Sequence, residues 1–157
     1  MSYNEKFLRE AIQLSLEKME EGEGGPFGAV VVKDGRIVGR GWNCVTSKND
    51  PTAHAEMVAI RAACRHLDLF SLAGCEIYAS CEPCPMCLSA IYWARLDALY
   101  FAASKSDAAE AGFDDALIYT EISKPWDQRI LCSEQHLRLD AARVFDYWVK
   151  KPDHTPY

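Results

Sequence analysis

The sequence of 157 residues lacks the features that mark membrane, secreted and repeat proteins. No apolar run approaches the ~18 residues of a membrane span, and the first residues lack the basic and then apolar pattern of a signal peptide. The chain also has no internal repeat and no low-complexity tract. We therefore expect one cytoplasmic domain over residues 1–157, long enough to bury a substantial core and without a membrane partner.

The sequence is also short of positive charge. It has 17 Lys and Arg residues against 23 Asp and Glu residues, which gives a formal net charge of −6. An acidic surface repels polyanions, whereas proteins that bind nucleic acid usually carry a basic footprint. A small neutral substrate is therefore favoured over nucleic acid. The odd count of 7 cysteines, with no secretory signal, favours reduced thiols and metal ligands over a disulfide framework.

Apolar periodicity and turn residues predict a hairpin followed by alternating helices and strands. The expected helices cover 4–21, 51–67 with Asp50 as its cap and Pro51 as its first residue, a stretch from Pro85, 106–111, 115–122 and 140–150; the expected strands cover 27–32, 36–42, 76–80, 98–102 and 130–132. Ala141, Val144, Phe145 and Trp148 are expected to face inward from the last helix. This order predicts an α/β fold with a mixed sheet of about five strands, covered by helices on both faces.

Two short motifs carry residues that bind metals. They are Thr52-Ala53-His54-Ala55-Glu56 and Cys81-Glu82-Pro83-Cys84-Pro85-Met86-Cys87. Pro85 suits the first position of a helix, so Cys84 and Cys87 lie around its first turn with their sulfurs on one side. His54 and Glu56 point about 200° apart on a helix, so they can serve one site only at the helix start. We therefore expect two helix N-termini to point at one metal. Their positive ends, together with the zinc ion, favour thiolate over thiol.

Taken alone, Cys84 and Cys87 also fit a structural zinc site or a redox dithiol. The addition of His54 and Glu56 favours a catalytic zinc site, because H-x-E followed by P-C-x-x-C is the pattern of zinc deaminases. Three ligands, His54, Cys84 and Cys87, leave a fourth position open for water. Glu56 is then free to move a proton from that water to a ring nitrogen and to departing ammonia.

Cys81 offers an alternative, because it also stands three residues from Cys84. A closed site that included Cys81 as a fourth ligand would be structural. Pro83 separates Cys81 from the helix start, so we expect Cys81 to end the preceding strand and to lie beside the metal.

Longer segments around these motifs resemble a known family. They are Gly24-Gly25-Pro26-Phe27-Gly28-Ala29-Val30, Asn49-Asp50-Pro51-Thr52-Ala53-His54-Ala55-Glu56, the Cys81–Cys87 segment, Ile91-Tyr92-Trp93-Ala94-Arg95 and Asp107-Ala108-Ala109-Glu110-Ala111-Gly112-Phe113-Asp114-Asp115. Through them the sequence resembles the cytidine deaminase-like superfamily of zinc deaminases and, within it, the bacterial guanine deaminases. The segment that ends at Asp115 is the most specific, because the zinc motifs are shared across the superfamily. The resemblance is close over residues 5–125 and weak in the tail.

The resemblance implies a three-layer α/β/α fold, one zinc ion per subunit and hydrolysis of guanine to xanthine and ammonia in purine catabolism. It also implies a homodimer in which the C-terminal segment, about 150–157, crosses to the partner's active site. By motif position, Asn43 and Asp115 would hydrogen-bond the purine, Phe27 and Trp93 would line its pocket, Ala55 would contact it, and Tyr157 would close the partner's site. Read without the resemblance, Phe27 and Trp93 are equally suited to a core, and Asp115 to a helix cap.

Other functions share parts of this pattern. Deaminases of guanosine, of an aminotriazine such as ammeline, or of adenosine in transfer RNA use the same zinc chemistry. The acidic charge balance and the Phe113-Asp114-Asp115 segment count against the transfer RNA substrate. A zinc-stabilised binding module without catalysis is the non-enzyme alternative, and Glu56 would have no reason to be a carboxylate there.

Overall fold

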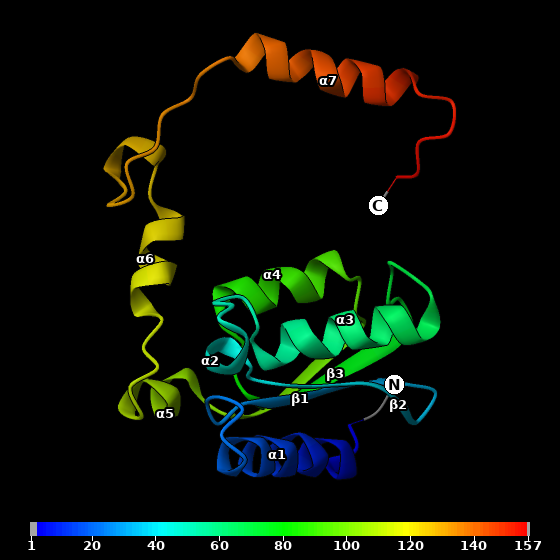
Figure 1. Cartoon of the computed structure of the whole chain (residues 1–157), viewed down its shortest axis with the longest axis vertical. Helices are drawn as coiled ribbons and strands as arrows, with labels where there is room; N and C mark the ends of the chain where they lie inside the picture. Colours follow the sequence, from blue (N-terminus) through cyan, green and yellow to red (C-terminus); the bar gives the residue numbers. More distant parts are fainter. Residues whose placement is uncertain (1–2, 157) are drawn as a thin grey trace. The chain divides into compact units, whose positions relative to one another are not determined.

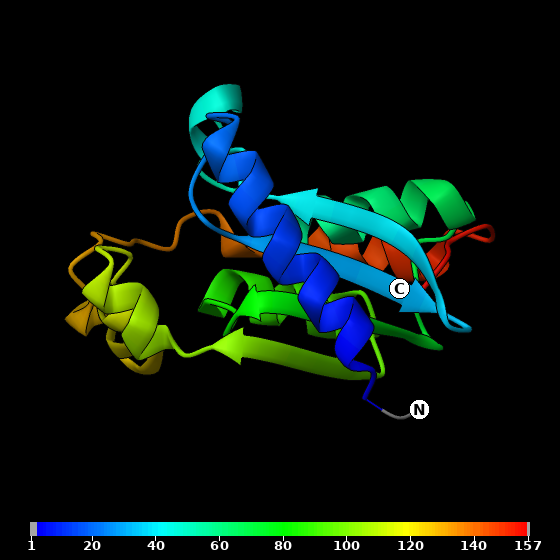
Figure 2. The same ribbon diagram turned by 90° about the horizontal axis from the view of Figure 1, so that it is seen from below.

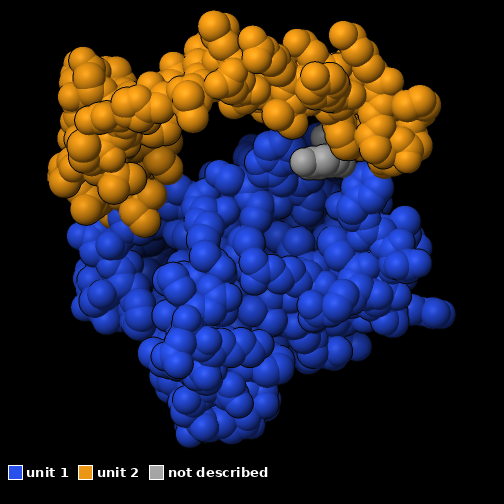
Figure 3. Space-filling model, turned by 45° about the horizontal axis from the view of Figure 1, so that its top comes forward, with its two compact units in different colours: residues 1–115 blue, residues 116–157 orange. Residues whose placement is uncertain are grey.

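The structure is a computed structural model that describes residues 3–156. Two compact units make up the chain, and the division falls after Asp115 (Figure 3). None of the helices found in residues 3–156 combines the length and the apolar character needed to cross a membrane.

A mixed β-sheet forms the centre of the first unit. Its strands are β1 (Gly28–Lys33), β2 (Arg36–Trp42), β3 (Cys75–Cys81) and β4 (Ala98–Ala103), in the order β2-β1-β3-β4. β1 runs antiparallel to both β2 and β3, whereas β4 runs parallel to β3. Over the residues described, the sheet has four strands, close to the number that the sequence predicts.

Helices cover both faces of this sheet. α1 (Glu5–Glu20) lies across one face, and α3 (Ala55–Leu67) and α4 (Pro85–Trp93) lie on the other (Figures 1 and 2). Side chains of β1 alternate between the two layers. Ala29 and Val31 join the core beneath α3 and α4, whereas Val30 and Val32 pack with Phe7 of α1. The three-layer α/β/α prediction is therefore confirmed.

Glycine lets α3 approach β2 closely. A Cβ atom on Gly41 would lie 2.1 Å from the carbonyl oxygen of Ala55 and 2.3 Å from the amide nitrogen of Ala59. Real Cβ atoms do not come this close to backbone, so only glycine permits this contact. The first turn of α3 is thus held directly against the sheet.

The prediction that α3 begins at Pro51 is wrong, because the helix begins at Ala55 with His54 as its N-cap residue. A carboxylate oxygen of Asp50 accepts hydrogen bonds from the amide and the hydroxyl of Thr52, at 2.8 and 2.7 Å. Asp50 therefore caps a local turn and not the helix. Between β2 and this turn lies a short helix, α2 (Val45–Lys48), that the sequence did not indicate.

The second unit contains α6 (Ala116–Ser123), the 3₁₀ helix η1 (Trp126–Gln128) and α7 (Arg138–Lys150). Residues 130–132 do not form the predicted strand. The amide of Ile130 instead donates to the Glu121 carboxylate at 2.7 Å, which ties this segment to α6.

The predicted inward face of α7 is also wrong for the single chain. Ala141, Val144, Phe145 and Trp148 are all exposed, Phe145 by 71% of its surface. No residue described between 116 and 156 is buried, so this unit has no core of its own. Helical periodicity identified the apolar stripe correctly but could not say what covers it.

Candidate metal centre

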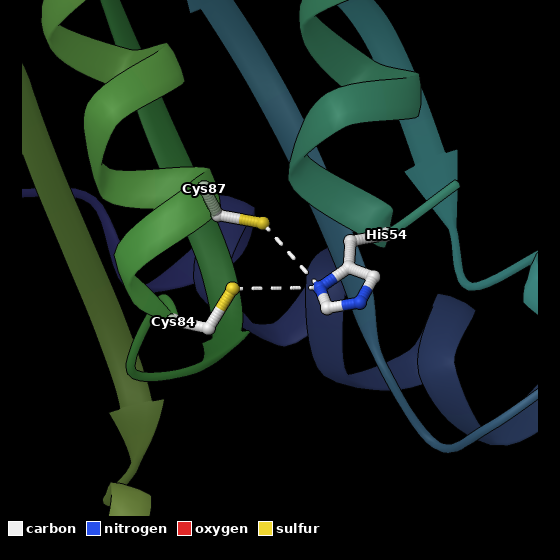
Figure 4. Close-up of side chains that lie close together, drawn as sticks. All are labelled: His54, Cys84 and Cys87. Carbon is white, nitrogen blue, oxygen red and sulfur yellow. Dashed lines mark hydrogen bonds between the residues drawn. The ribbon is translucent and has the colours of Figure 1, made fainter. Parts of the chain in front are cut away.

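The first turns of α3 and α4 bring three metal-binding side chains together. His54 is the N-cap residue of α3, and Cys84 is the N-cap residue of α4, where Pro85 occupies the first turn. Cys87 follows in that turn and is buried. Figure 4 shows the two sulfur atoms and the imidazole ring turned toward one another from the two helices.

The distances fit a tetrahedral zinc ion. The Sγ atoms of Cys84 and Cys87 lie 3.5 and 3.6 Å from Nδ1 of His54, and the three donor atoms all lie within 4.8 Å of one another. Zinc bonds of about 2.3 Å to sulfur and about 2.0 Å to nitrogen, at a tetrahedral angle, place sulfur and nitrogen roughly 3.5 Å apart. His54, Cys84 and Cys87 are therefore positioned to bind one metal ion, with His54 contributing Nδ1.

The two thiols differ in acidity. The pKa of Cys84 falls to about 4, first because Cys87 donates a hydrogen bond to its sulfur and then because His54 does. The pKa of Cys87 is raised by the same hydrogen bond and by burial. The arrangement thus favours the thiolate at Cys84 over that at Cys87, and metal binding by both sulfurs would release the proton of Cys87.

Glu56 lies in the first turn of α3, next to the three ligands but not among them. Its side chain is buried, with only 8% of the residue exposed. Burial raises the pKa of its carboxyl group, and hydrogen bonds from its own backbone amide and from the Cys87 thiol oppose this shift. A buried carboxyl group with a raised pKa beside a metal site is suited to accept and return a proton.

Cys81 lies at the end of β3, outside the three-residue cluster. It is buried, and its sulfur lies 3.6 Å from the carbonyl oxygen of Ser104. Burial is the main cause that raises the pKa of its thiol to about 11. The thiol of Cys81 therefore faces the Ser104 carbonyl oxygen, and its sulfur is not grouped with the donor atoms of His54, Cys84 and Cys87.

Two of the predicted substrate contacts lie in polar settings. Asn43 is buried, and its side-chain oxygen accepts hydrogen bonds from the amides of Gly25 and Val45, both at 3.2 Å. Asp115 is half-buried, and its pKa is raised first by burial and then by the negative charge of Cys84. Asp115 therefore lies within electrostatic reach of the metal ligands.

Comparison with known proteins identifies the family. Residues 1–103 match the family model described as the cytidine and deoxycytidylate deaminase zinc-binding region. The chain belongs to this deaminase family.

Several individual deaminases are similar to this chain. A guanine deaminase of Bacillus subtilis (strain 168) is 53% identical over 145 residues, which cover 92% of this chain and 93% of the relative. The X-ray structure of guanine deaminase from Bacillus subtilis matches with a TM-score of 0.96 and 50% identity, and 99% of each chain is covered. The similarity thus reaches well beyond residues 5–125.

More distant members share less of the chain. A tRNA-specific adenosine deaminase of Aquifex aeolicus (strain VF5) is 44% identical over 99 residues, which cover 63% of this chain and 65% of the relative. A solved structure of guanine deaminase from Nitrosomonas europaea has a TM-score of 0.69 and 31% identity, and covers 74% of this chain and 67% of its own. These matches support the cytidine deaminase-like fold and a zinc cofactor.

The remaining residues predicted to contact the substrate differ in how close they lie to the metal cluster. Ala55 is buried at the start of α3, beside the metal ligands, and Phe27 is half-buried against the core. Trp93 ends α4, at the opposite end from Cys84, and 65% of it is exposed, so the single chain does not bring it to the cluster. Tyr157 lies outside the described residues.

Sequence reasoning missed one aromatic contact. The ring of Phe113 meets that of Phe27 edge to face, with 4.9 Å between ring centroids. Its position in the segment that resembles guanine deaminases was the available signal, but the partner 86 positions earlier in the chain was not evident.

Proposed function

We propose that this chain is a zinc-dependent hydrolase that converts guanine and water to xanthine and ammonia. The observation that carries this proposal is the similarity to a guanine deaminase over 92% of the chain. The metal cluster of His54, Cys84 and Cys87, with the buried carboxyl group of Glu56 beside it, supports it. We place the activity in cytoplasmic purine catabolism.

The residues around the metal divide the chemistry among them. Zinc, when bound by His54, Cys84 and Cys87, supplies a Lewis acid that lowers the pKa of water. Glu56 takes a proton from the attacking water and passes it to a ring nitrogen of guanine. It then takes the second proton from the hydroxyl group now bound to the ring carbon and delivers it to the departing amine, which leaves as ammonia while the carbonyl group of xanthine forms. A pKa raised by burial makes the carboxylate a stronger base toward water and lets the carboxyl group hold a proton between the two transfers.

The proposed pocket supplies both a donor and an acceptor. The carboxamide oxygen of Asn43 is already bonded to two backbone amides, so its NH₂ group is the part left to donate to an oxo group or ring nitrogen. The Asp115 carboxylate accepts from an N–H of the base. Guanine offers groups of both kinds. Phe27 and Ala55 line the site, and Trp93 belongs to the pocket only if a second subunit completes it.

A second candidate is adenosine in transfer RNA, because a tRNA-specific adenosine deaminase is 44% identical over 99 residues. That similarity covers only 63% of this chain. The net charge of −6 also disfavours an anionic partner, and the proposal therefore includes no nucleic acid. Guanosine and ammeline remain the nearer rivals.

A substrate panel separates these activities. We expect ammonia release from guanine to exceed that from cytosine, cytidine and adenine by at least about 100-fold in kcat/KM, because a site built to hydrogen-bond one base leaves its polar groups unpaired with another. The assay uses zinc-loaded protein and includes guanosine, ammeline and an adenosine-containing tRNA stem-loop. Activity on guanosine without activity on guanine would contradict the base-level assignment.

We further propose that residues 1–157 act as one domain within a homodimer, and that the segment near 150–157 reaches the partner's active site. The exposed apolar side chains of α7, among them Val144 and Phe145, support a covering partner, because monomers rarely expose large contiguous apolar patches. The absence of a buried residue between 116 and 156 supports it as well.

Removal of Tyr157 tests this exchange. We expect roughly tenfold lower kcat/KM for guanine with an unchanged melting temperature, because a residue that closes a site affects turnover more than folding. The decisive measurement mixes the Tyr157 deletion with Glu56→Gln after unfolding and refolding them together. One site of each mixed dimer then combines its own Glu56 with the partner's Tyr157, so activity should rise above that of either variant alone. No gain on mixing means that the tail does not act on the partner.

A further inference from the structure

Phe113 ends the turn that leads from α5 (Lys105–Glu110) to Asp115. Gly112 adopts φ of +93°, and its amide donates to the carbonyl oxygen of Ala109 at 3.0 Å. The amide of Phe113 donates to the carbonyl oxygen of Ala108 at 2.9 Å. These bonds fix the backbone where the chain leaves α5, but Asp115 follows two residues later, beyond the turn.

The Phe113 ring contacts residues 25–27, which are distant in sequence. Its centroid lies 4.9 Å from that of Phe27 at an interplanar angle of 89°, an arrangement favoured by aromatic quadrupoles. A Cβ atom added to Gly25 would lie 3.3 Å from the tip of the same ring, so the ring lies against the bare backbone of Gly25. Phe113 is nevertheless 45% exposed, so this contact is not explained by burial in the main core.

Residues 25–27 also hold Asn43. The amide of Gly25 donates to the Asn43 side-chain oxygen at 3.2 Å, and the carbonyl oxygen of Phe27 accepts from the Asn43 amide at 3.0 Å. A Cβ atom on Gly24 would lie 2.6 Å from the Asn43 side-chain oxygen, so this loop fits only without one. Phe113 therefore packs against residues 25–27, the same segment whose backbone forms hydrogen bonds with Asn43.

We propose that Phe113 is a positioning residue that keeps the Asp115 carboxylate in register with the Asn43 carboxamide across the purine site. The contact between the rings of Phe27 and Phe113 connects the segment 112–115, which includes Asp115, with residues 25–27, which form hydrogen bonds with Asn43. The expected changes in kcat/KM rest on the proposed guanine deamination. The expected change in backbone protection at residues 112–115 rests only on the ring contacts.

Phe113→Ala tests the kinetic consequence. We expect kcat/KM for guanine to fall about 10- to 100-fold, because small misplacement of an orienting group has effects of this size. Most of the change should be a rise in KM, since Asp115 and Asn43 also bind the ground state. Zinc content and melting temperature show whether the variant is folded. If Phe113→Ala does not fold, Phe113→Leu is the substitute variant, because leucine keeps an apolar side chain but lacks the aromatic ring. Phe101→Ala is the matched control, because Phe101 is also 45% exposed and lies on β4, and it belongs neither to the metal cluster nor to the Phe27–Phe113 ring pair.

A double-mutant cycle shows whether Phe113 acts through Asp115. In the Asp115→Asn background, Phe113→Ala should change kcat/KM by less than about twofold, because contacting residues in one network are non-additive. The proposal is overturned if the fold-changes in kcat/KM of Phe113→Ala and Asp115→Asn multiply in the double variant. It is also overturned if kcat/KM and KM of Phe113→Ala stay within twofold of the wild type. Loss of guanine turnover in the wild type would instead refute the proposed function.

Amide hydrogen exchange without substrate tests the same proposal independently of activity. Exchange at residues 112–115 should rise at least tenfold in Phe113→Ala and stay unchanged in Phe101→Ala. Unchanged protection at residues 112–115 in Phe113→Ala overturns the proposal whatever the substrate is.

Discussion

Glu56→Gln is expected to lower kcat for guanine about 10²- to 10⁴-fold, the usual contribution of a general acid–base group, while the protein keeps its zinc and its fold. Glutamine matches the size of glutamate but cannot take a proton from water. The change is tolerated structurally because Glu56 is not among the metal ligands, and because burial already favours its neutral form. Ammonia release at saturating guanine, together with zinc content per chain, measures both outcomes.

Glu82→Gln is the matched control for this substitution. Glu82 lies between Cys81 and Cys84 in sequence, and its carboxylate accepts from the backbone amide of Lys105 at 3.0 Å. The same loss of charge there should leave kcat within about twofold of the wild type, since the Glu82 carboxylate is hydrogen-bonded to the Lys105 amide and is not grouped with the metal-binding residues. If Glu56→Gln retained a tenth or more of wild-type turnover, Glu56 could not be the main proton carrier.

The metal cluster could be predicted from sequence because its geometry follows from local rules. Pro85 fixes the first turn of α4, so the spacing of Cys84 and Cys87 alone places both sulfurs on one side. His54 was assigned to the first turn of a helix that begins at Pro51. The helix begins at Ala55 instead, with His54 as its N-cap residue, so His54 does lie at a helix start but not for the predicted reason. Glu56 lies in the first turn of the same helix, which is the placement that a shared site requires.

The predictions for the start of α3 and for the face of α7 are wrong because both depend on contacts that the local sequence pattern does not specify. Asp50 and Pro51 form an acceptable helix start, but Thr52 supplies two hydrogen bonds that make a turn instead. The period of α7 identifies an apolar face at Val144 and Phe145, yet periodicity carries no information on what covers it. A helix with an exposed apolar face has the same sequence pattern whether its cover lies within the chain or on another molecule.

Contacts between distant segments could be predicted only for the zinc-binding motifs, where residue type indicates a shared site. The resemblance named Asn43 and Asp115 as substrate contacts, but it did not show that Gly25 orients Asn43 or that Phe113 meets Phe27. Those contacts join residues 18 and 86 positions apart, and they depend on how β1 and α5 are placed by the sheet. The resemblance therefore proposed groups for the reaction, but it could not indicate which contacts hold those groups in place.

Cys84→Ala is expected to abolish guanine turnover and to weaken zinc binding by more than about 100-fold, because even changes to the partners of metal ligands weaken affinity 10- to 100-fold. Cys84 is the ligand that already carries the thiolate, with a pKa lowered to about 4. The melting temperature should fall as well, since a metal that binds only the folded state stabilises it. Zinc content per chain and thermal unfolding with and without a chelator measure these effects.

Cys81→Ala distinguishes an open catalytic site from a closed structural one. Cys81 is buried beside the cluster, and its sulfur lies next to the Ser104 carbonyl oxygen and not among the ligand atoms. Its removal should leave about one zinc ion per chain and turnover within about threefold of the wild type, at the stability cost of a small buried side chain. Loss of zinc from Cys81→Ala as complete as that from Cys84→Ala would mean four protein ligands. With four ligands no coordination position would remain for water, so the hydrolytic function would fail with the three-ligand site. Retention of zinc in Cys81→Ala, with loss in Cys84→Ala, leaves the fourth position open for the water that Glu56 would deprotonate.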